Sequence, residues 1–359
     1  MGIHGSATCT LNFGDDDKCK AFIVGEECQG IRQMFHMMNH ARLGVGLQGV
    51  SLSAQAYNYA FEYAKERIQG VDIEKLKDPN AERVAIVEHP DVKRMLMWQK
   101  AMVEGCRALL YQTAFYQDVA NAGCDDKQRE EAQYSVEFLT PICKAWCTDW
   151  SFRVAEWCLQ VFGGYGYTKD YPAEQYLRDA KIGSIYEGTN GIQALDLMAR
   201  KIPAHDGKPI AELMARVHST VENLSGDSQL GGPALRLDKA AKQLQETMAE
   251  VSQRPDAMQS LMLNAVPFLD MVGTTLAGNF LLEQANLATS KLSQILAAKG
   301  VDAENEEAVA GVLKDDEEAA FYHNKIQTAT HFAFRALPMV KALGVGIRAG
   351  EMAPINAHL

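Results

Sequence analysis

Residues 139–161 read LTPICKAWCTDWSFRVAEWCLQV. Large apolar side chains recur in this stretch at intervals of four, three, four, four, three and four residues; they are Leu139, Cys143, Trp146, Trp150, Val154, Trp157 and Val161. Intervals of three and four residues place side chains on one face of an α-helix. The stretch therefore predicts a long amphipathic helix with a buried apolar face, and Pro141 is expected to kink this helix or to start it.

Three other segments show helical spacing. The stripes are Val50, Ala54, Tyr57, Phe61 and Ala64 within a helix expected from Ile31 to Ile68, then Met95, Met102, Leu109 and Tyr116, and finally Ile192, Leu195 and Ala199 after Thr189. Four amphipathic segments joined by polar connections are typical of a helical bundle. The sequence therefore predicts a mainly α fold with a four-helix bundle over residues 31–203.

The two ends of the chain differ from this bundle. Breaks at 203–209 and 225–233 separate apolar stripes at 210–224 and 241–251, and further helices are expected at 258–298 and 315–342, so a second all-helical domain is predicted over 204–359. Residues 8–13 and 21–24 have strand composition around a turn. Because two short strands alone form no stable sheet, residues 1–30 are interpreted as the end of a truncated β-domain.

Composition excludes several classes of protein. The chain has 359 residues, which suggests two domains, and a formal net charge of -11, which argues against a nucleic-acid binder. No uninterrupted apolar run reaches the ~18 residues of a membrane span, so no integral membrane segment is expected. The eight cysteines form no C-x-x-C pair, and Cys143 and Cys147 follow a helical apolar pattern, so a reducing, cytoplasmic setting is predicted.

Familiar site motifs are absent or lie in the wrong context. Gly44, Gly46 and Gly49 match the dinucleotide pattern G-x-G-x-x-G, but they lie inside a helical run, so close helix packing or a bend in the helix is the better interpretation. None of the nine histidines follows a Glu by three residues, which argues against a di-iron bundle, and no metal site is predicted. A G-x-S-x-G nucleophile motif is also missing.

The stretch from Gln160 to Gln193 carries the candidate site. Gly163 and Gly164 end the long helix, where they serve either as a helix cap or as backbone open to a ligand. Thr189 is a candidate N-cap for the next helix. Glu187 lies just before that helix start, and it is either a catalytic carboxylate or a surface glutamate stabilised by the helix dipole.

Taken together, these motifs resemble the C-terminal half of an acyl-CoA dehydrogenase. The resemblance rests on IYEGT at 185–189, RDAK at 178–181 and QVFGG at 160–164, and it continues upstream through ERIQG at 66–70, VEH at 87–89 and the helix that contains Arg42. The region after 204 is similar to the extra helical domain of larger bacterial members. Among these, the 3-methylmercaptopropionyl-CoA dehydrogenases are the most similar, including the opening residues MGIHGSATC.

The resemblance implies a flavoprotein oxidoreductase of fatty acid β-oxidation that uses FAD for the α,β-dehydrogenation of an acyl-CoA. Electrons would pass to an electron-transferring flavoprotein. Glu187 would remove the α-proton, and Gly188 would lie beside the thioester. Other substrate contacts would come from Asn39, His40, Ala41 and Arg42. Cofactor contacts would come from Arg67, Gln69, His89, Pro90, Gln160, Val161, Phe162, Gly163, Gly164, Thr189, Asn190 and Gly191.

Subunit organisation also follows from the resemblance. Arg67 and Gln160 to Gly164 would contact the flavin of a partner subunit, which implies a homodimer or a dimer of dimers. Many members have Gln where this chain has Gly191, so one side-chain contact is lost or replaced by backbone. The N-terminal domain and most of the β-domain, which supply the family's main isoalloxazine contacts, are not in the sequence. A non-catalytic fragment that keeps only the helical dimerisation surfaces is therefore the alternative function.

Overall fold

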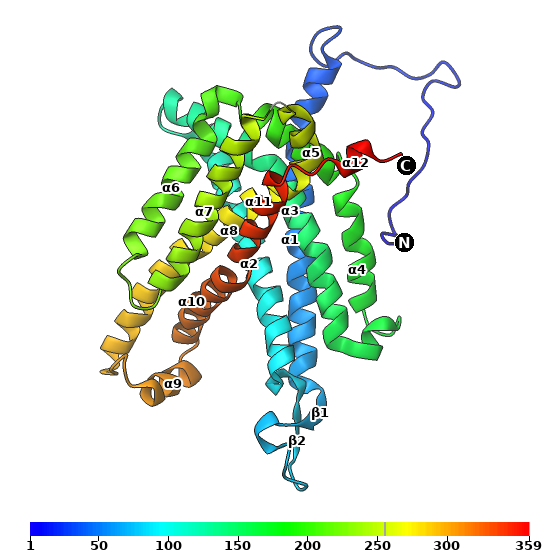
Figure 1. Cartoon of the computed structure of the whole chain (residues 1–359). Helices are drawn as coiled ribbons and strands as arrows, with labels where there is room; N and C mark the ends of the chain where they lie inside the picture. Colours follow the sequence, from blue (N-terminus) through cyan, green and yellow to red (C-terminus); the bar gives the residue numbers. More distant parts are fainter. Residues whose placement is uncertain (255, 359) are drawn as a thin grey trace.

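The computed structural model describes residues 1–254 and 256–358, apart from the side chains of Arg32, Phe35 and His36. Three long helices form its centre (Figure 1), namely α1 (Gly30–Glu66), α2 (Pro90–Ala122) and α3 (Asp126–Phe162). The shorter helix α4 (Ala173–Lys181) packs against α1 and α3. The expected fourth long helix is instead a seven-residue helix, α5 (Asn190–Asp196), which continues as five residues of π-helix (Leu197–Lys201).

Glycines let α1 and α3 approach each other closely. A Cβ atom at Gly46 would lie 3.0 Å from the carbonyl oxygen of Cys143, and one at Gly49 would lie 3.0 Å from that of Cys147. Any larger residue would force the two backbones apart. The packing interpretation of the glycine motif is thus confirmed for these two glycines, and both cysteines are buried in the core as predicted.

The start of α3 corrects one expectation. The helix begins at Asp126, where the Asp125 side chain accepts a hydrogen bond of 2.8 Å from the backbone N–H of Gln128. Pro141 therefore lies inside the helix and does not start it. Proline has no N–H to donate to the carbonyl of Glu137, and the burial of the surrounding α3 residues offsets this lost hydrogen bond.

The predicted strands are misplaced. Residues 8–13 and 21–24 form no strand, and they are exposed. The two strands that the described residues contain are β1 (Ile68–Val71) and β2 (Arg83–Ala85), which pair antiparallel at the far end of α1 and α2 (Figure 1). A strand needs a partner for its backbone groups. The ends of α1 and α2 bring β1 and β2 together, whereas residues 8–24 meet no such partner.

Short 3-10 turns and helices complete the chain. The turns cover Ile73–Lys75, Ile86–Glu88, Gly163–Tyr167, Ile182–Ser184 and Ala204–Gly207. The remaining helices are α6 (Lys208–Leu224), α7 (Gly231–Ser252), α8 (Ala257–Ala298), α9 (Glu306–Asp315), α10 (Glu317–Arg335), α11 (Leu337–Arg348) and α12 (Ala353–Asn356). The single helix expected at 315–342 is thus divided at Ala336, because Pro338 in the first turn of α11 disfavours helical continuation before it.

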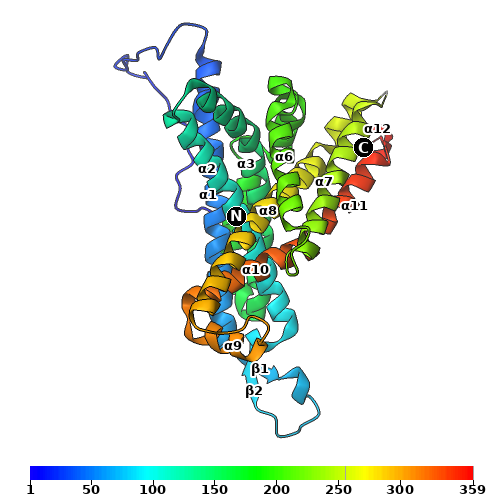
Figure 2. The same cartoon turned by 90° about the vertical axis from the view of Figure 1, so that its left-hand side faces the viewer.

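Helix α8 joins the two helical regions. It packs against α2, α3 and α5 on one side, and Figure 2 shows α6, α7 and α11 on the side that faces away from α1. The indole Nε1 of Trp146 on α3 donates a hydrogen bond of 3.2 Å to Thr274 Oγ1 on α8. By length and composition α8 could cross a membrane, but 83% of its most apolar window is buried, so it is a core helix of a soluble fold.

Candidate functional site

Eight of the predicted cofactor residues line one cavity of about 690 Å³. It lies where α1 ends, α2 begins and α3 ends, close to β1. The predicted residues that line it are Arg67, Gln69, His89, Gln160, Val161, Phe162, Gly163 and Gly164. Pro90, the first residue of α2, is adjacent to His89 but is not among the lining residues. The end of the bundle therefore brings together predicted residues that are up to 97 positions apart in the sequence.

Backbone and aromatic groups shape this cavity. Gly163 has a φ of +60°, and nothing lies within 4 Å of the Cβ position at Gly163 or Gly164, so the peptide groups there are open to a ligand. The Arg67 guanidinium carbon lies 5.1 Å from the centre of the Tyr165 ring. Such a planar guanidinium can stack on an aromatic face and still pair with a phosphate. Tyr165 was not among the predicted site residues, although the ring lies directly after the glycine pair.

His89 has a structural contact within the same cavity. One ring nitrogen, Nε2, lies 2.6 Å from the carbonyl oxygen of Gln69, and its ring also lies 3.2 Å from the Cβ position of Gly70. Gly70 lies in β1 and has a φ of +74°, so only glycine suits this backbone conformation and the close approach of the His89 ring. The imidazole thus links the start of α2 to β1, and its Nε2 already has the Gln69 carbonyl as its hydrogen-bond partner.

The second group of predicted residues surrounds the turn before α5. Glu187 has a φ of +58° and Gly188 a φ of +81°, so two consecutive residues occupy the left-handed region. Thr189 Oγ1 accepts a hydrogen bond of 3.3 Å from the N–H of Ile192, which confirms the predicted N-cap. Glu187 is half-buried, and the neighbouring Tyr186 hydroxyl donates to Gln48 Oε1. Gly191 lies in the first turn, as expected.

Lys144 is the main residue of this group that sequence reasoning missed. Its side chain is 0% exposed, and Nζ donates hydrogen bonds of 2.8 Å to the carbonyl oxygen of Gly188 and of 2.8 Å to Asn190 Oδ1. Burial lowers the pKa of Lys144 to about 8, assisted by Arg42 and opposed by Asp149 and Glu187. The sequence signal that could have identified this residue is a lysine within the otherwise apolar stretch of α3.

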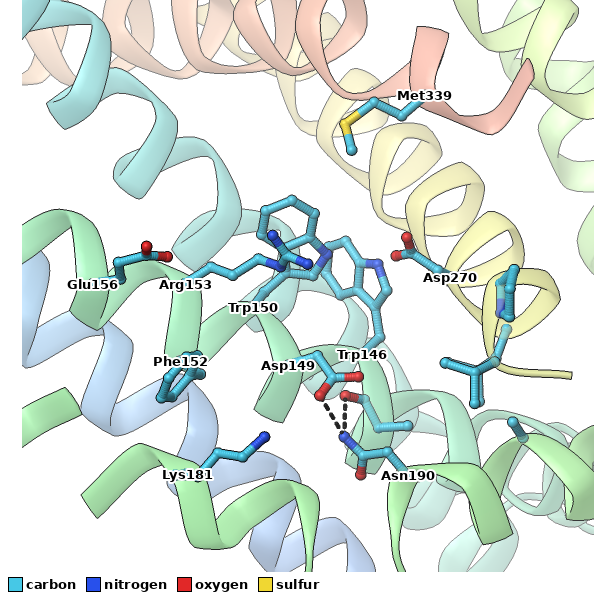
Figure 3. Close-up of a pocket in the computed structure, with 15 residues that line it drawn as sticks. Trp146, Asp149, Trp150, Phe152, Arg153, Glu156, Lys181, Asn190, Asp270 and Met339 are labelled. Carbon is cyan, nitrogen blue, oxygen red and sulfur yellow. Dashed lines mark hydrogen bonds between the residues drawn. The ribbon is translucent and has the colours of Figure 1, made fainter. Parts of the chain in front are cut away.

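The Asn190 side chain is used inside the protein. Its Nδ2 donates to Asp149 Oδ1 at 2.8 Å, to Thr148 Oγ1 at 3.0 Å and to the carbonyl of Ala145 at 3.1 Å. Figure 3 shows Asn190 and Asp149 facing each other at the edge of another cavity, of about 530 Å³. The Asn190 amide is therefore committed to these internal partners and is not available for the cofactor contact predicted for this residue.

Arg42 connects α1 to the Glu187 turn. It is 3% exposed and forms an ion pair with Asp196 at 3.4 Å, while its Nε has no hydrogen-bond partner. A Cβ atom at Gly188 would lie 3.8 Å from its Nη2. Asn39 and Ala41 are partly buried and His40 is exposed on the preceding turn of α1. A buried donor without a partner, such as this Nε, is what a bound carbonyl or water would satisfy.

The two groups are well separated along α3. Lys144, which contacts Gly188, precedes Gln160 of the 690 Å³ cavity by 16 residues, a rise of about 24 Å along a helix. Within the described residues, no three His, Cys, Asp or Glu side chains form a metal-binding group. The arrangement therefore offers a carboxylate at one position and an open, cationic cavity at the other.

Comparisons with known proteins show which protein family this chain is similar to. The family described as "Acyl-CoA dehydrogenase, C-terminal domain" matches residues 28–202, and "Acetyl-CoA dehydrogenase C-terminal like" matches residues 213–357. A 3-methylmercaptopropionyl-CoA dehydrogenase from Ruegeria pomeroyi is 36% identical over 343 residues, which are 94% of this chain and 53% of that protein. The chain spans about half the length of the curated relatives it matches.

Solved structures share the fold. ACDH-11 from Caenorhabditis elegans, in complex with C11-CoA, has a TM-score of 0.69 at 16% identity and is matched over 94% of this chain and 50% of its own. An acyl-CoA dehydrogenase from Bacillus anthracis, complexed with FAD, has a TM-score of 0.58 at 19% identity over 89% of this chain and 53% of its own. The helical architecture is common to all three chains.

Proposed function

Because the chain belongs to the acyl-CoA dehydrogenase family, we propose that it contributes the C-terminal part of an enzyme that dehydrogenates an acyl-CoA at its α,β-bond with FAD. The observation that carries this proposal is the left-handed Glu187–Gly188 turn, in which a half-buried glutamate precedes a glycine whose Cβ position lies 3.8 Å from Arg42 Nη2. Experiments on this chemistry use the flavin-loaded protein.

Glu187 is the base in this proposal. The α-carbon loses a proton to the Glu187 carboxylate, the β-carbon loses a hydride, and a double bond forms between the two carbons. FAD, when bound, supplies the acceptor for that hydride. Only glycine suits position 188, because its φ is +81° and a Cβ atom there would lie 2.8 Å from Gln193 Nε2.

The 690 Å³ cavity fits the phosphate end of FAD. Arg67 can pair bidentately with a phosphate, and the uncovered backbone at Gly163 and Gly164 admits a close approach. Gln69 and Gln160 add polar side chains that can bond to a ribose or an adenine. Val161 and Phe162 are buried and support the wall.

Replacing Arg67 with Ala is expected to weaken FAD binding by about 10- to 100-fold, the range that losing a hydrogen bond to a charged group produces. Titration of the apoprotein with FAD, followed by flavin fluorescence, measures the Kd. Arg83→Ala is the matched control, since Arg83 is an exposed arginine of β2 outside the cavity lining. If wild-type protein binds no flavin, the non-catalytic alternative holds; if Arg67→Ala binds normally, Arg67 has no role in the site.

We propose further that the protein is a homo-oligomer, a dimer or a dimer of dimers. This proposal is based on the separation of about 24 Å along α3 between the Glu187 turn and the 690 Å³ cavity of one chain. We propose that the two groups of one chain serve different active sites. In hybrid dimers of Arg67→Ala and Glu187→Gln chains, one of the two sites would be intact. At an FAD concentration that fills the sites with Arg67 but leaves the Arg67→Ala sites empty, mixed subunits are expected to recover about a quarter of wild-type activity, since half of random dimers are hybrids and each hybrid has one active site of two. A monomer in sedimentation, or no recovery on mixing, contradicts this.

Two finer assignments belong to the same proposal. Electrons would leave the protein through an electron-transferring flavoprotein, which reoxidation of the reduced flavin by that protein tests. A cytoplasmic location is supported by the free cysteines among the described residues, four of which are buried without forming disulfides.

A further inference from the structure

The backbone at the proposed base is strained. Glutamate rarely adopts a φ of +58°, because its Cβ then crowds the backbone. Gly188 continues the left-handed path with a φ of +81°. Such conformations persist where the surrounding structure holds them in place. The turn therefore needs specific contacts that hold its two carbonyl groups.

Two buried side chains provide these contacts. Lys144 Nζ donates to the Gly188 carbonyl oxygen at 2.8 Å. Gln193 Nε2 donates to the same oxygen at 3.2 Å and to the carbonyl oxygen of Glu187 at 3.3 Å. Both side chains are 0% exposed, so water does not compete for these bonds. Lys144 and Gln193 together thus hold both peptide groups of the turn.

Lys144 is itself fixed from the opposite side. Its ammonium also donates to Asn190 Oδ1 at 2.8 Å, and the Asn190 amide is bonded to Asp149, Thr148 and the Ala145 carbonyl of α3 (Figure 3). The position of the Gly188 carbonyl is therefore tied to the rigid centre of α3. Loss of the ammonium would leave two buried acceptors with fewer donors, and the turn could relax.

We propose that Lys144 is a positioning residue for the reaction, which holds the Glu187–Gly188 turn in its left-handed form and so fixes the place of the base. This rests on the proposed function, in which Glu187 takes the α-proton. Lys144 touches neither substrate nor flavin in this proposal. It acts through the Gly188 carbonyl, with Gln193 as the second donor.

The test is Lys144→Met in the flavin-loaded protein, since methionine keeps the length of the side chain and removes its donors. Flavin reduction by a straight-chain acyl-CoA in stopped flow is expected to slow by about 10- to 100-fold, the cost of misplacing a catalytic group by about 1 Å. The Kd for the same acyl-CoA, measured by calorimetry, is expected to change less than about threefold, because the turn contributes mainly to the transition state. Lys127→Met, an exposed lysine on the same helix, is the matched control.

Four outcomes decide the matter. A Lys144→Met protein that reduces flavin at the wild-type rate, while Glu187→Gln does not, overturns this proposal and leaves the proposed function intact. If Glu187→Gln is also as fast as wild type, the base assignment itself has failed. If Lys144→Met does not fold, Gln193→Met is tested instead. A normal rate of flavin reduction in that variant also overturns the proposal. Equal losses in rate and acyl-CoA affinity would indicate a merely structural role.

Discussion

Glu187→Gln is expected to reduce the rate of flavin reduction by an acyl-CoA by at least ~10²-fold, within the range that loss of a general base produces. Glutamine keeps the size and the hydrogen-bonding oxygen of glutamate, but its amide cannot take the α-proton. The affinity for acyl-CoA is expected to stay close to that of the wild type, because the variant keeps the Gly188 turn and Arg42. Stopped-flow bleaching of the flavin gives the rate, and the dependence on acyl-CoA concentration gives the Kd.

The competing interpretation makes a different prediction. A glutamate that only stabilises the start of α5 through the helix dipole is worth ~0.3–1 kcal/mol, so its replacement would lower stability slightly and leave bleaching near normal. Glu306→Gln is the control, because Glu306 lies in the first turn of α9, outside the proposed site. A Glu187→Gln protein that bleaches at the wild-type rate would falsify the assignment of Glu187 as the base.

Trp146→Ala is expected to lower the free energy of unfolding by about 3–5 kcal/mol, the usual cost of truncating a fully buried aromatic residue. Trp146 is 1% exposed and lies against the backbone of α8, where a Cβ at Gly273 would approach its ring to 2.6 Å. Truncation also removes the hydrogen bond to Thr274. Urea denaturation followed by circular dichroism measures the loss.

A control on the same helix sharpens this prediction. Trp157 is also on α3 but only partly buried, with its ring edge-on to Trp98 at 5.8 Å. Trp157→Ala is therefore expected to cost less than half as much. If Trp146→Ala destabilised the protein by less than about 1 kcal/mol, the contact between α3 and α8 would contribute little to folding.

Local patterns in the sequence predicted the long helices and indicated a close contact at the glycines of α1. The seven-residue spacing of Met95, Met102 and Leu109 predicted one helix face, and all three side chains are buried in α2. Gly46 and Gly49 indicated close helix packing, which the structure shows between α1 and α3. Thr189 marked the start of α5. These features depend on residues close together in the chain, so periodicity and local capping chemistry suffice to find them.

Only the tertiary structure decided where the strands lie and which polar groups are buried. Strand composition favoured residues 8–24, but pairing occurs between 68–71 and 83–85, because α1 and α2 bring those two segments together. Helical spacing cannot show that Lys144 meets Gly188, 44 residues away, or that Arg67 stacks on Tyr165. The free energy of a buried charge or an isolated strand depends on its partner, and the fold alone determines which partner comes within reach.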